Sequence, residues 1–417
     1  MFIFETMESE VRSYSRAWPT VFTTARGAHL YDENGRAWLD FFAGAGALNY
    51  GHNHPELKEA LLDYLGRDGI THGLDMHTVA KGAFLERFRE LVLLPRGLDY
   101  RVQFPGPTGT NAVEAALKLA RKVTGRRTVG YFDRAFHGMT LGSLAITANP
   151  TKRAGAGVPL PHTAPLPYDD PRDDDASAVA RLAQALDAQG ESLAAVIVET
   201  VQGEGGVNAV RPVWLRELAR WASQHDVLLV VDDVQMGCGR TGPFFSFEEA
   251  GILPDIICLS KSISGYGLPM ALTLMKPTLD VWKPGEHNGT FRGYNPAFVT
   301  AARALELFWS DHSQASQTTQ RAQWVGRSLR ETARRHGLRE PRGRGLVWAL
   351  PFDEPAMARR VCATAYGLGL LVETAGLHDE VVKLLPPLTI ADDELAKGLT
   401  ILDNAVGATL KHSGLAA

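Results

Sequence analysis

VLLVVDDVQMGCGRTG at residues 227–242 and PDIICLSKSISGYG at residues 254–267 are the two stretches that decide the fold. Each opens with a continuous apolar run rich in β-branched residues, which is typical of buried parallel strands. The first run stops at Asp232, and the second stops just before Lys261. Because ligands of open α/β sheets bind at the carboxyl ends of the strands, we predict that both side chains lie at one edge of a sheet.

A buried amine and a carboxylate at one sheet edge are suited to pyridoxal phosphate. The amine of Lys261 can condense with the aldehyde, while the carboxylate of Asp232 can keep the pyridine nitrogen protonated. Burial also lowers the pKa of a lysine and frees its lone pair. A capping aspartate and a solvated lysine are the commoner interpretation of one such pair. The prediction therefore depends on finding other parts of the same site.

A candidate phosphate site lies in the turn Thr108-Gly109-Thr110-Asn111, which opens a predicted helix with its core at 112–122. The free N–H groups and the dipole of a helix N-terminus bind phosphate, and the hydroxyls of Thr108 and Thr110 would add donors. An ordinary helix N-cap explains the threonines and the asparagine equally well.

Two further strand ends carry polar or aromatic side chains. The strand predicted at 127–132 leads to Phe136 and His137, and the strand predicted at 193–198 ends on Glu199 before a Gly-rich turn with Glu204. An aromatic side chain there could stack on a flat ring, although core packing is the commoner role. Structural hydrogen bonding is the default role for Glu199. Further strands are predicted at 101–104 and at 271–275, the latter as a candidate antiparallel strand.

Small residues at Gly44-Ala45-Gly46 are predicted to line a cavity, with Ala45 on the substrate side. They do not complete a G-x-G-x-x-G dinucleotide loop. His52 and His54 could ligate a metal ion, but loop packing before a helix that starts at Pro55 is the preferred interpretation. We therefore predict no metal site.

Composition narrows the functional classes. The 417 residues include 45% hydrophobic and 22% charged residues, which is ordinary for a globular protein. The formal net charge of −4 and the lack of a basic patch argue against nucleic-acid binding. The three cysteines are too scattered for a disulfide framework or a metal site. No signal peptide or membrane span is apparent. A cytoplasmic protein is expected.

The remaining patterns predict a second, smaller region. An Asn-Gly turn at Asn34-Gly35 between apolar runs predicts a hairpin. A polar helix at 314–335 is predicted to lead into residues 341–417, where strand and helix signals alternate. We predict a segment at 1–55 that joins the small domain, a large cofactor-binding domain at 56–313 and a small C-terminal domain at 314–417. Helices are also predicted at 55–67 and 77–94, and an acidic surface loop is predicted at 168–175.

The assembled motifs resemble those of class III (ω-type) aminotransferases of pyridoxal-phosphate fold type I over nearly the whole chain. The class-level motifs are VVDDVQMGCGRTG, LSKSISGYG, TGTNAVEAALKLAR, AFHGMT, ETVQGEGG and LLPPL. Longer strings, such as DFFAGAGALNYGHNHP and GEHNGTFRGYNPAFVTA, resemble the narrower group of L-2,4-diaminobutyrate aminotransferases of ectoine biosynthesis. The resemblance implies an α/β fold. Its large domain has a mostly parallel seven-stranded sheet between helices, and both termini build a smaller α+β domain.

The resemblance also implies a role for each motif residue. Lys261 would bind the cofactor aldehyde and then shuttle a proton, and Asp232 would pair with the pyridinium nitrogen. Val234 and Phe136 would pack on the two faces of the ring, and Gln235 would approach its hydroxyl. The other positions that we expect at the cofactor are Thr108, Gly109, Thr110, His137, Glu199 and Thr290.

Thr290 would reach the phosphate of a neighbouring subunit, which implies at least a homodimer with shared sites. Two positions depart from the pattern of the class. Asp233 replaces a glutamate, and Lys383 stands where an arginine commonly binds the substrate α-carboxylate. Lysine cannot form the bidentate fork of arginine. Glu204 resembles the acid that pairs with that arginine when an ω-amine occupies the site. We include Ala45, Glu204 and Lys383 as substrate-binding positions.

The implied reaction transfers an amino group from L-glutamate to L-aspartate 4-semialdehyde, which gives L-2,4-diaminobutyrate and 2-oxoglutarate. Other ω-aminotransferase activities remain open, including those on 4-aminobutyrate, on ornithine, and in siderophore-type diaminobutyrate production. An NAD-dependent oxidoreductase would require the dinucleotide loop that is missing here. A non-catalytic relative should have lost Lys261 or Asp232, and both are present.

Overall fold

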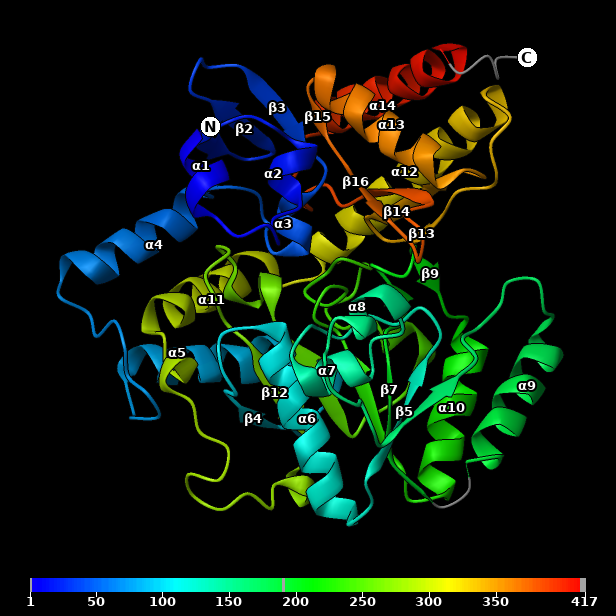
Figure 1. Cartoon of the computed structure of the whole chain (residues 1–417). Helices are drawn as coiled ribbons and strands as arrows, with labels where there is room; N and C mark the ends of the chain where they lie inside the picture. The colour runs from blue at the N-terminus through cyan, green and yellow to red at the C-terminus, as the bar shows by residue number, and fades with distance from the viewer. Residues whose placement is uncertain (1, 190–191, 413–417) are drawn as a thin grey trace.

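A computed structural model of the chain describes residues 2–189 and 192–412. Its centre is a seven-stranded sheet in the order β4-β12-β11-β10-β7-β5-β6 (Figure 1). The five strands from β11 to β6 run parallel, and β12 is antiparallel to both of its neighbours. The predicted mostly parallel seven-stranded sheet and its antiparallel member are therefore confirmed. The strands are β4 (Arg101–Gln103), β5 (Thr128–Phe132), β6 (Thr163–Leu166), β7 (Leu193–Val198), β10 (Leu228–Asp232), β11 (Ile256–Leu259) and β12 (Leu272–Met275).

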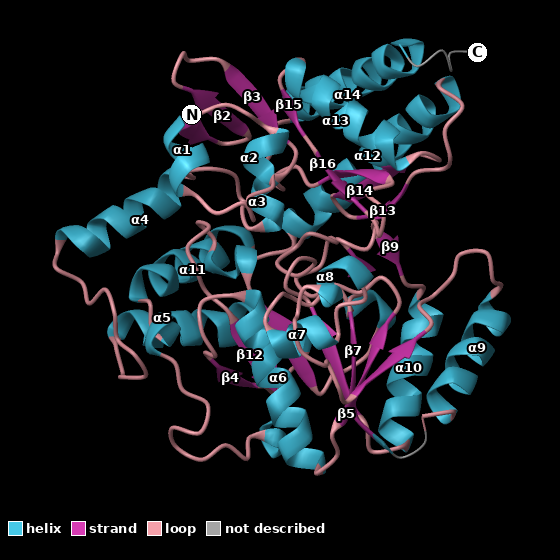
Figure 2. Ribbon diagram, in the orientation of Figure 1, coloured by secondary structure: helices cyan, strands magenta, loops and turns pink. Residues whose placement is uncertain are grey.

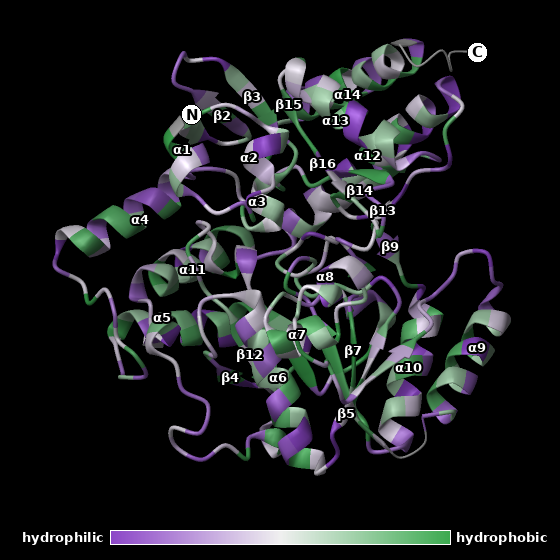
Figure 3. Ribbon diagram, viewed as in Figure 1, coloured by the Kyte–Doolittle hydropathy of each residue, from purple (hydrophilic) through white to green (hydrophobic). Residues whose placement is uncertain are grey.

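The sheet is covered by helices on both faces (Figures 1 and 2). Alternate residues of β10 show this arrangement, because Val230 packs in the cluster that contains α6, whereas Leu229 and Val231 pack against the opposite layer. The central strands are largely hydrophobic, while the outer helices alternate hydrophobic and hydrophilic residues (Figure 3). The first layer is α6 (Gly109–Thr124), and the opposite layer includes α5 (Val79–Phe88), α9 (Asp175–Asp187), α10 (Pro212–Gln224) and α11 (Asn295–Phe308).

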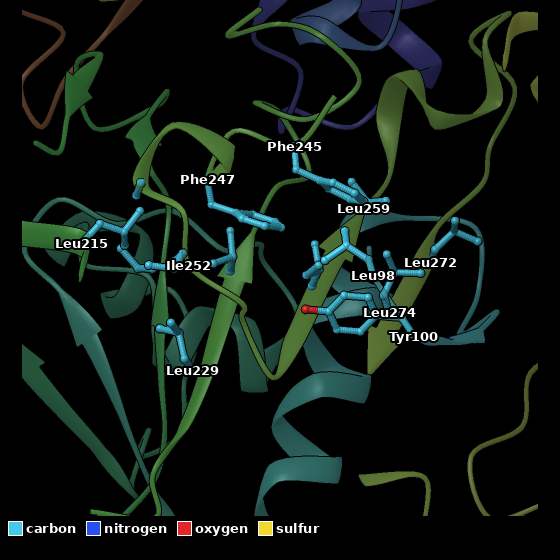
Figure 4. Packing of buried hydrophobic residues seen from close by; sticks show 14 of the residues in the cluster. Leu98, Tyr100, Leu215, Leu229, Phe245, Phe247, Ile252, Leu259, Leu272 and Leu274 are labelled. Atoms are coloured by element: carbon cyan, nitrogen blue, oxygen red, sulfur yellow. The ribbon is translucent and has the colours of Figure 1, made fainter. Parts of the chain in front are cut away.

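Figure 4 shows the opposite layer from close by. Leu259 lies beside the ring of Phe245, and Leu229 and Leu272 of two other strands belong to the same buried cluster. All of these side chains are buried. Burying apolar side chains of this size stabilises the fold by about 1.5–3 kcal/mol each. The rigid sheet therefore holds the strand ends, and the polar residues that follow them, in fixed positions.

Several local predictions need correction. The helix predicted at 77–94 is α5 only as far as Phe88, followed by a π-helical turn, Arg89–Leu93, and a 3₁₀ turn, Leu94–Arg96. Pro95 and the left-handed Gly97 end the helical run there. The helix predicted at 55–67 is confirmed as α4 (Pro55–Gly66).

The acidic stretch at 168–175 is not wholly a surface loop. Tyr168 and Asp169 are buried. The Tyr168 hydroxyl donates to the carbonyl oxygen of Glu199 at 2.8 Å, and Asp169 forms an ion pair with Arg211. The start of this acidic stretch therefore packs behind a strand end of the central sheet.

A second region lies above the large sheet in Figure 1 and combines both ends of the chain. The predicted hairpin is confirmed by antiparallel β2 and β3. Strand β15 pairs in parallel with β3, so residues more than three hundred positions apart share one sheet. The proposed division of the chain at 55/56 and 313/314 stays a prediction. The strands here are β1 (Phe22–Arg26), β2 (His29–Asp32), β3 (Ala37–Asp40), β13 (Arg342–Arg344), β14 (Val347–Pro351), β15 (Leu370–Leu371), β16 (Glu373–Ala375) and β17 (Val381–Leu384).

Helices of this region cover its two four-stranded sheets, whose orders are β1-β2-β3-β15 and β13-β14-β17-β16. A shared core joins Leu39 and Phe41 of the N-terminal part to Val325 and Leu395 of the C-terminal part. No helix within the described ranges 2–189 and 192–412 is long and apolar enough to cross a membrane. The remaining elements are α1 (Phe2–Met7), α2 (Tyr14–Ala17), α3 (Ala43–Gly46), α7 (Leu141–Ala145), α8 (Pro150–Ala154), β8 (Val201–Gln202), β9 (Asn208–Ala209), α12 (Ser313–Arg335), α13 (Pro355–Gly367) and α14 (Asp392–His412).

A buried arginine connects the loop after β10 to the second region. Both terminal nitrogens of Arg240 donate hydrogen bonds, to the carbonyl oxygens of Leu346 (2.9 Å) and Pro386 (2.6 Å) and to Oδ1 of Asn49 (2.6 Å). Its side chain is fully buried. Hydrogen bonds from a charged donor are stronger than neutral ones, so this residue fixes three chain segments at once.

We expect Arg240→Leu to lower the free energy of unfolding by about 3 kcal/mol, because the hydrogen bonds of a buried charged donor are lost. Urea unfolding followed by tryptophan fluorescence measures the change. The control Arg216→Leu, at an exposed position on α10, should stay within about 0.5 kcal/mol of the parent. Equal losses in the two variants would contradict the proposed connection.

Candidate active site

One cavity of about 170 Å³ lies at the carboxyl ends of the central strands. It collects residues that are up to 152 positions apart in the chain, from Gly109 to Lys261. Of the predicted site residues, those lining this cavity are Gly109, Thr110, Phe136, His137, Glu199, Glu204, Asp232, Val234, Gln235 and Lys261. Gly138 and Met236 also line it, and sequence reasoning did not single them out.

Lys261 and Asp232 reach the cavity because β10 and β11 pair in parallel, with Asp232 opposite Cys258. Lys261 follows the end of β11 and has a positive φ of 52°. Non-glycine residues rarely adopt this conformation, and such residues are concentrated at functional sites. Desolvation lowers the pKa of Lys261, although the charge of Glu204 opposes that shift. A larger fraction of the Lys261 amine is therefore neutral than in a solvated lysine at the same pH.

Asp232 forms a buried pair with His137. His137 Nδ1 lies 2.7 Å from Asp232 Oδ2, and the other oxygen accepts the backbone N–H of Val234 at 3.1 Å. Burial disfavours the charged form of the imidazole, but the hydrogen bond to Asp232 and its charge raise the pKa of His137 overall. These two contacts hold the Asp232 carboxylate in a fixed position at the cavity.

Glu199 holds the Phe136 loop in place. The backbone N–H of Phe136 donates to Glu199 Oε1 at 2.8 Å. Desolvation raises the pKa of Glu199 to about 7, and the charge of His137 opposes that shift. The ammonium of Lys152 lies 4.4 Å from the centre of the Phe136 ring, so the aromatic side chain also carries a cation–π contact. Glu199 thus has the structural role that is the default for such a residue, and it also lines the cavity.

The N-terminus of helix α6 forms one part of the cavity wall. A Cβ atom on Gly109 would approach Val234 Cγ1 to 2.7 Å, so only glycine allows the start of helix α6 to pack this closely against Val234. Gly109 and Thr110 begin the 16-residue helix α6, whose first N–H groups have no partner within the helix. Unpaired N–H groups at the positive end of a helix dipole form an anion site.

The hydroxyls of the phosphate turn have partners of their own. Thr108 is exposed, and both its backbone N–H and its hydroxyl donate to Asn111 Oδ1, at 3.1 and 2.8 Å. Its side chain therefore acts as part of a helix cap, which was the alternative interpretation, and Thr108 does not line the cavity. The Thr110 hydroxyl lies 2.6 Å from that of Thr140 and 2.8 Å from that of Ser143.

The substrate-side candidates form one chain of polar contacts. Gln235 Nε2 donates to the carbonyl oxygen of Ala45 at 3.0 Å and to Glu204 Oε1 at 3.3 Å. Glu204 Oε1 also accepts from Lys383 Nζ at 2.6 Å. Burial alone would raise the pKa of Glu204, but the charges of Lys383 and Lys261 lower it to about 2. Glu204 is therefore an ionised acid at the cavity.

Lys383 has a second carboxylate partner that sequence reasoning missed. Its ammonium lies 3.0 Å from Glu373 Oε1, and the Tyr14 hydroxyl donates to Glu373 Oε2 at 3.3 Å. Glu373 and Lys383 are directly opposite in the antiparallel β16–β17 pair. Correct pairing of the two predicted strands would have brought them together. Nothing in the local sequence pattern around Tyr14 pointed to this cluster.

Thr290 and the two candidate metal ligands, His52 and His54, lie outside the cavity. Thr290 is exposed on a 3₁₀ turn, Thr290–Arg292, and does not line the cavity. His52 Nε2 lies 2.7 Å from Asp40 Oδ2, and the His54 ring packs edge-on to that of Phe308. Within the described part of the chain, no group of three or more His, Cys, Asp or Glu side chains is placed to hold a metal ion.

The shortened acid Asp233 points away from the cavity. Its two carboxylate oxygens accept hydrogen bonds from the backbone N–H and the hydroxyl of Ser246. Burial raises the pKa of Asp233 to about 7. The aspartate thus braces the loop behind Asp232 and does not enter the cavity.

The described residues fit pyridoxal phosphate. They supply an amine of lowered pKa, a buried carboxylate backed by a histidine, a helix N-terminus that lines the cavity, and an aromatic ring in the cavity wall. Together these four features meet the requirements of pyridoxal phosphate chemistry.

Comparison with known proteins agrees with this fit. The sequence model of the family described as "Aminotransferase class-III" matches residues 11–406. A "Diaminobutyrate--2-oxoglutarate transaminase" of Nocardia farcinica is 62% identical over 97% of this chain and 93% of its own length. Proteins of the same name are 60% identical in Streptomyces avermitilis (98% of each chain) and 53% identical in Virgibacillus pantothenticus (99% of this chain and 100% of the relative).

Solved structures give the same result for the fold. The ornithine aminotransferase from Toxoplasma gondii ME49 has a TM-score of 0.86 and 27% identity, and the match covers 99% of this chain and 95% of that one. A transaminase from the marine bacterium Virgibacillus has a TM-score of 0.87 at 19% identity, over 99% of each chain, and supports the fold alone. The chain therefore belongs to the class III aminotransferases, which are pyridoxal-phosphate-dependent enzymes of fold type I.

Proposed function

We propose that this aminotransferase moves the amino group of L-glutamate to L-aspartate 4-semialdehyde, giving L-2,4-diaminobutyrate and 2-oxoglutarate. The observation that supports this most strongly is the 62% identity to a diaminobutyrate–2-oxoglutarate transaminase over 97% of the chain. We further propose that the product enters ectoine synthesis. Other ω-aminotransferase activities, on 4-aminobutyrate, on ornithine or for siderophore-type diaminobutyrate, are the alternatives.

Pyridoxal phosphate, when bound, supplies an aldehyde for the amine and a ring that accepts electrons from the substrate carbon. The lowered pKa of Lys261 leaves its amine able to bind covalently and then to move a proton at the substrate carbon. Asp232, backed by His137, would keep a ring nitrogen protonated. Val234 and Phe136 would bound the flat faces of the ring, and Gln235 would approach its hydroxyl.

Anion binding at the helix α6 N-terminus would orient the group. The N–H groups of Gly109 and Thr110 would donate to the phosphate, while the Thr108 side chain stays in its cap with Asn111. His137 and Glu199 would shape the site beside the ring, and Thr290 would act from the neighbouring subunit.

Recognition must differ between the two half-reactions, because glutamate carries a carboxylate on its reacting carbon and the terminal carbon of diaminobutyrate does not. Lys383 would take that carboxylate when Glu204 turns away. Glu204 would stay paired with Lys383 when the ω-amine reacts. Ala45, whose carbonyl oxygen accepts from Gln235, would line the substrate side.

We also propose a homodimer. Support comes from an exposed apolar surface made by Leu74, Met76, Val79 and Phe291, where Val79 is 91% and Phe291 64% exposed. A backbone hydrogen bond of 2.8 Å from Gly73 N to the carbonyl oxygen of Gly293 joins the two segments that form this surface. Exposed apolar patches of this kind mark protein interfaces. The partner is then a second copy of this chain, and Thr290 lies beside the surface.

Cytoplasmic residence is a further proposal. Cys238, Cys258 and Cys362 are free thiols, as is usual in a reducing compartment.

Lys261→Ala should lower turnover by at least about 10³-fold, because both the covalent anchor and the proton shuttle are lost. Borohydride reduction followed by peptide mass spectrometry should find the cofactor on Lys261 in the parent and no such adduct in the variant. Lys276→Ala removes an ammonium that pairs with Asp255 at 2.7 Å. It should keep turnover within about twofold of the parent. A cofactor adduct on any other lysine of the parent would overturn the assignment.

The aldehyde substrate can be tested with glutamate as the common donor. We expect kcat/KM for L-aspartate 4-semialdehyde to exceed that for succinate semialdehyde and L-glutamate 5-semialdehyde by at least about tenfold. Product analysis by mass spectrometry should identify 2,4-diaminobutyrate. A higher value for either competitor would replace the proposed substrate with that aldehyde.

Phe291→Glu should shift the protein from dimer toward monomer in sedimentation velocity, because a charge would have to be buried in the apolar contact. Leu368→Glu, at a 50% exposed position at the end of α13, is the matched control and should leave the mass unchanged. A parent protein that sediments as a monomer would refute the proposed assembly.

A further inference from the structure

Lys383 is shared between two acids that come from different parts of the fold. Its ammonium lies 2.6 Å from Glu204 Oε1, on the loop after β8, and 3.0 Å from Glu373 Oε1, on the neighbouring strand β16. The lysine side chain has no exposed surface, and Glu373 is 8% exposed. Only Glu204 lines the cavity. One partner thus faces the substrate, and the other lies on the protein side.

Glu373 is itself held by a third element. The Tyr14 hydroxyl, on α2, donates to Glu373 Oε2 at 3.3 Å. Glu373 Oε1 accepts no hydrogen bond of regular geometry in the described part of the chain, although the Lys383 ammonium lies beside it. Burial raises the pKa of Glu373 to about 7, and Lys383 opposes that shift. A buried acid with an oxygen that lacks a regular hydrogen bond costs stability, and a neighbouring ammonium offsets that cost only in part.

The chemistry of lysine explains why a second acid matters here. A guanidinium is held in place by two parallel hydrogen bonds, whereas an ammonium on a four-carbon stem is a mobile point charge. If Glu204 were its sole partner, Lys383 would follow that carboxylate whenever it turned, or would be left buried without a counter-charge. Either outcome removes the cation from the position where a substrate carboxylate must bind.

We propose that Glu373, fixed by Tyr14, is a positioning residue that anchors the Lys383 ammonium next to Glu204, which lines the cavity, while Glu204 and the substrate α-carboxylate exchange places on it. This inference rests on the proposed function, in which Lys383 receives the carboxylate of glutamate. The anchor replaces the rigidity that a bidentate arginine would have supplied.

Removing the charge of Glu373 should weaken binding of the substrate carboxylate because Lys383 is displaced, and not because the net charge of the site changes. Glu204 and the substrate carboxylate compete for the same ammonium, so the loss of a nearby negative charge strengthens both contacts and the two effects offset. The remaining effect is a poorly placed Lys383. The half-reaction of diaminobutyrate needs no carboxylate on Lys383 and should be insensitive.

The test uses the pyridoxal-phosphate holoenzyme and three measurements. In Glu373→Gln, the dissociation constant of 2-oxoglutarate, measured by calorimetry on the aldehyde form with which this keto acid cannot exchange an amine, should rise about tenfold. Single-turnover spectroscopy should show the KM for glutamate raised by a similar factor and the diaminobutyrate half-reaction changed by less than about twofold. Glu380→Gln, with the same charge change on the same hairpin, should match the parent in all three measurements.

Tyr14→Phe is the second variant, and it removes only the hydroxyl of a residue that is 45% exposed. It should raise the same dissociation constant about threefold and decides the matter if Glu373→Gln does not fold. Equal losses in both half-reactions would show a general packing role and overturn the inference, as would unchanged 2-oxoglutarate binding in Tyr14→Phe and Glu373→Gln. A parent enzyme that fails to use glutamate or diaminobutyrate would instead refute the proposed function.

Discussion

The parallel pairing of β10 with β11 is the constraint on which the site depends. Val230 lies opposite Ile256 and Asp232 opposite Cys258, so the two strands end within one residue of each other. Both strands are almost completely buried, and a slip of one residue would move every side chain to the wrong face. Hydrophobic packing on both faces of the sheet therefore fixes the relative position of a carboxylate and an amine.

Charge is distributed around the cavity in two groups with different chemistry. On the ring side, Asp232 pairs with His137, and Glu199 beside them has its pKa raised by burial to about 7. On the substrate side, Glu204 and Glu373 share the ammonium of Lys383. Lys261 lies between these groups, and its own pKa is lowered by desolvation.

Much of this arrangement could be predicted from the sequence. Lys261 and Asp232 follow apolar β-branched runs, and Gly109 begins an amphipathic helix. These local patterns predict strands and a helix for physical reasons. Strand β6 was missed because it is a short edge strand that contains Pro165. The predicted surface loop was wrong at Tyr168 because burial there depends on a contact with the distant Glu199.

Glu373 illustrates the limit of sequence reasoning most clearly. Its contacts depend on a strand register that no local sequence pattern encodes, and on Tyr14, which precedes it by 359 positions. The placement of Thr108 had two local explanations, and only the contacts of its hydroxyl with Asn111 distinguish them. Sites assembled from distant segments are thus predictable at strand ends, where topology is simple, and much less so in the smaller region.

The parallel contact between β3 and β15 has a consequence for how the molecule is made. Leu39 pairs with Leu370, so the sheet that contains them cannot be completed until β15 has been synthesised. The N-terminal hairpin leaves the ribosome long before that point. Nascent chains of every intermediate length would carry an unpaired strand edge and an incomplete pocket. Translation must therefore be almost complete before the chain can form its active site. A chain truncated before residue 370 should be inactive, and not merely less active.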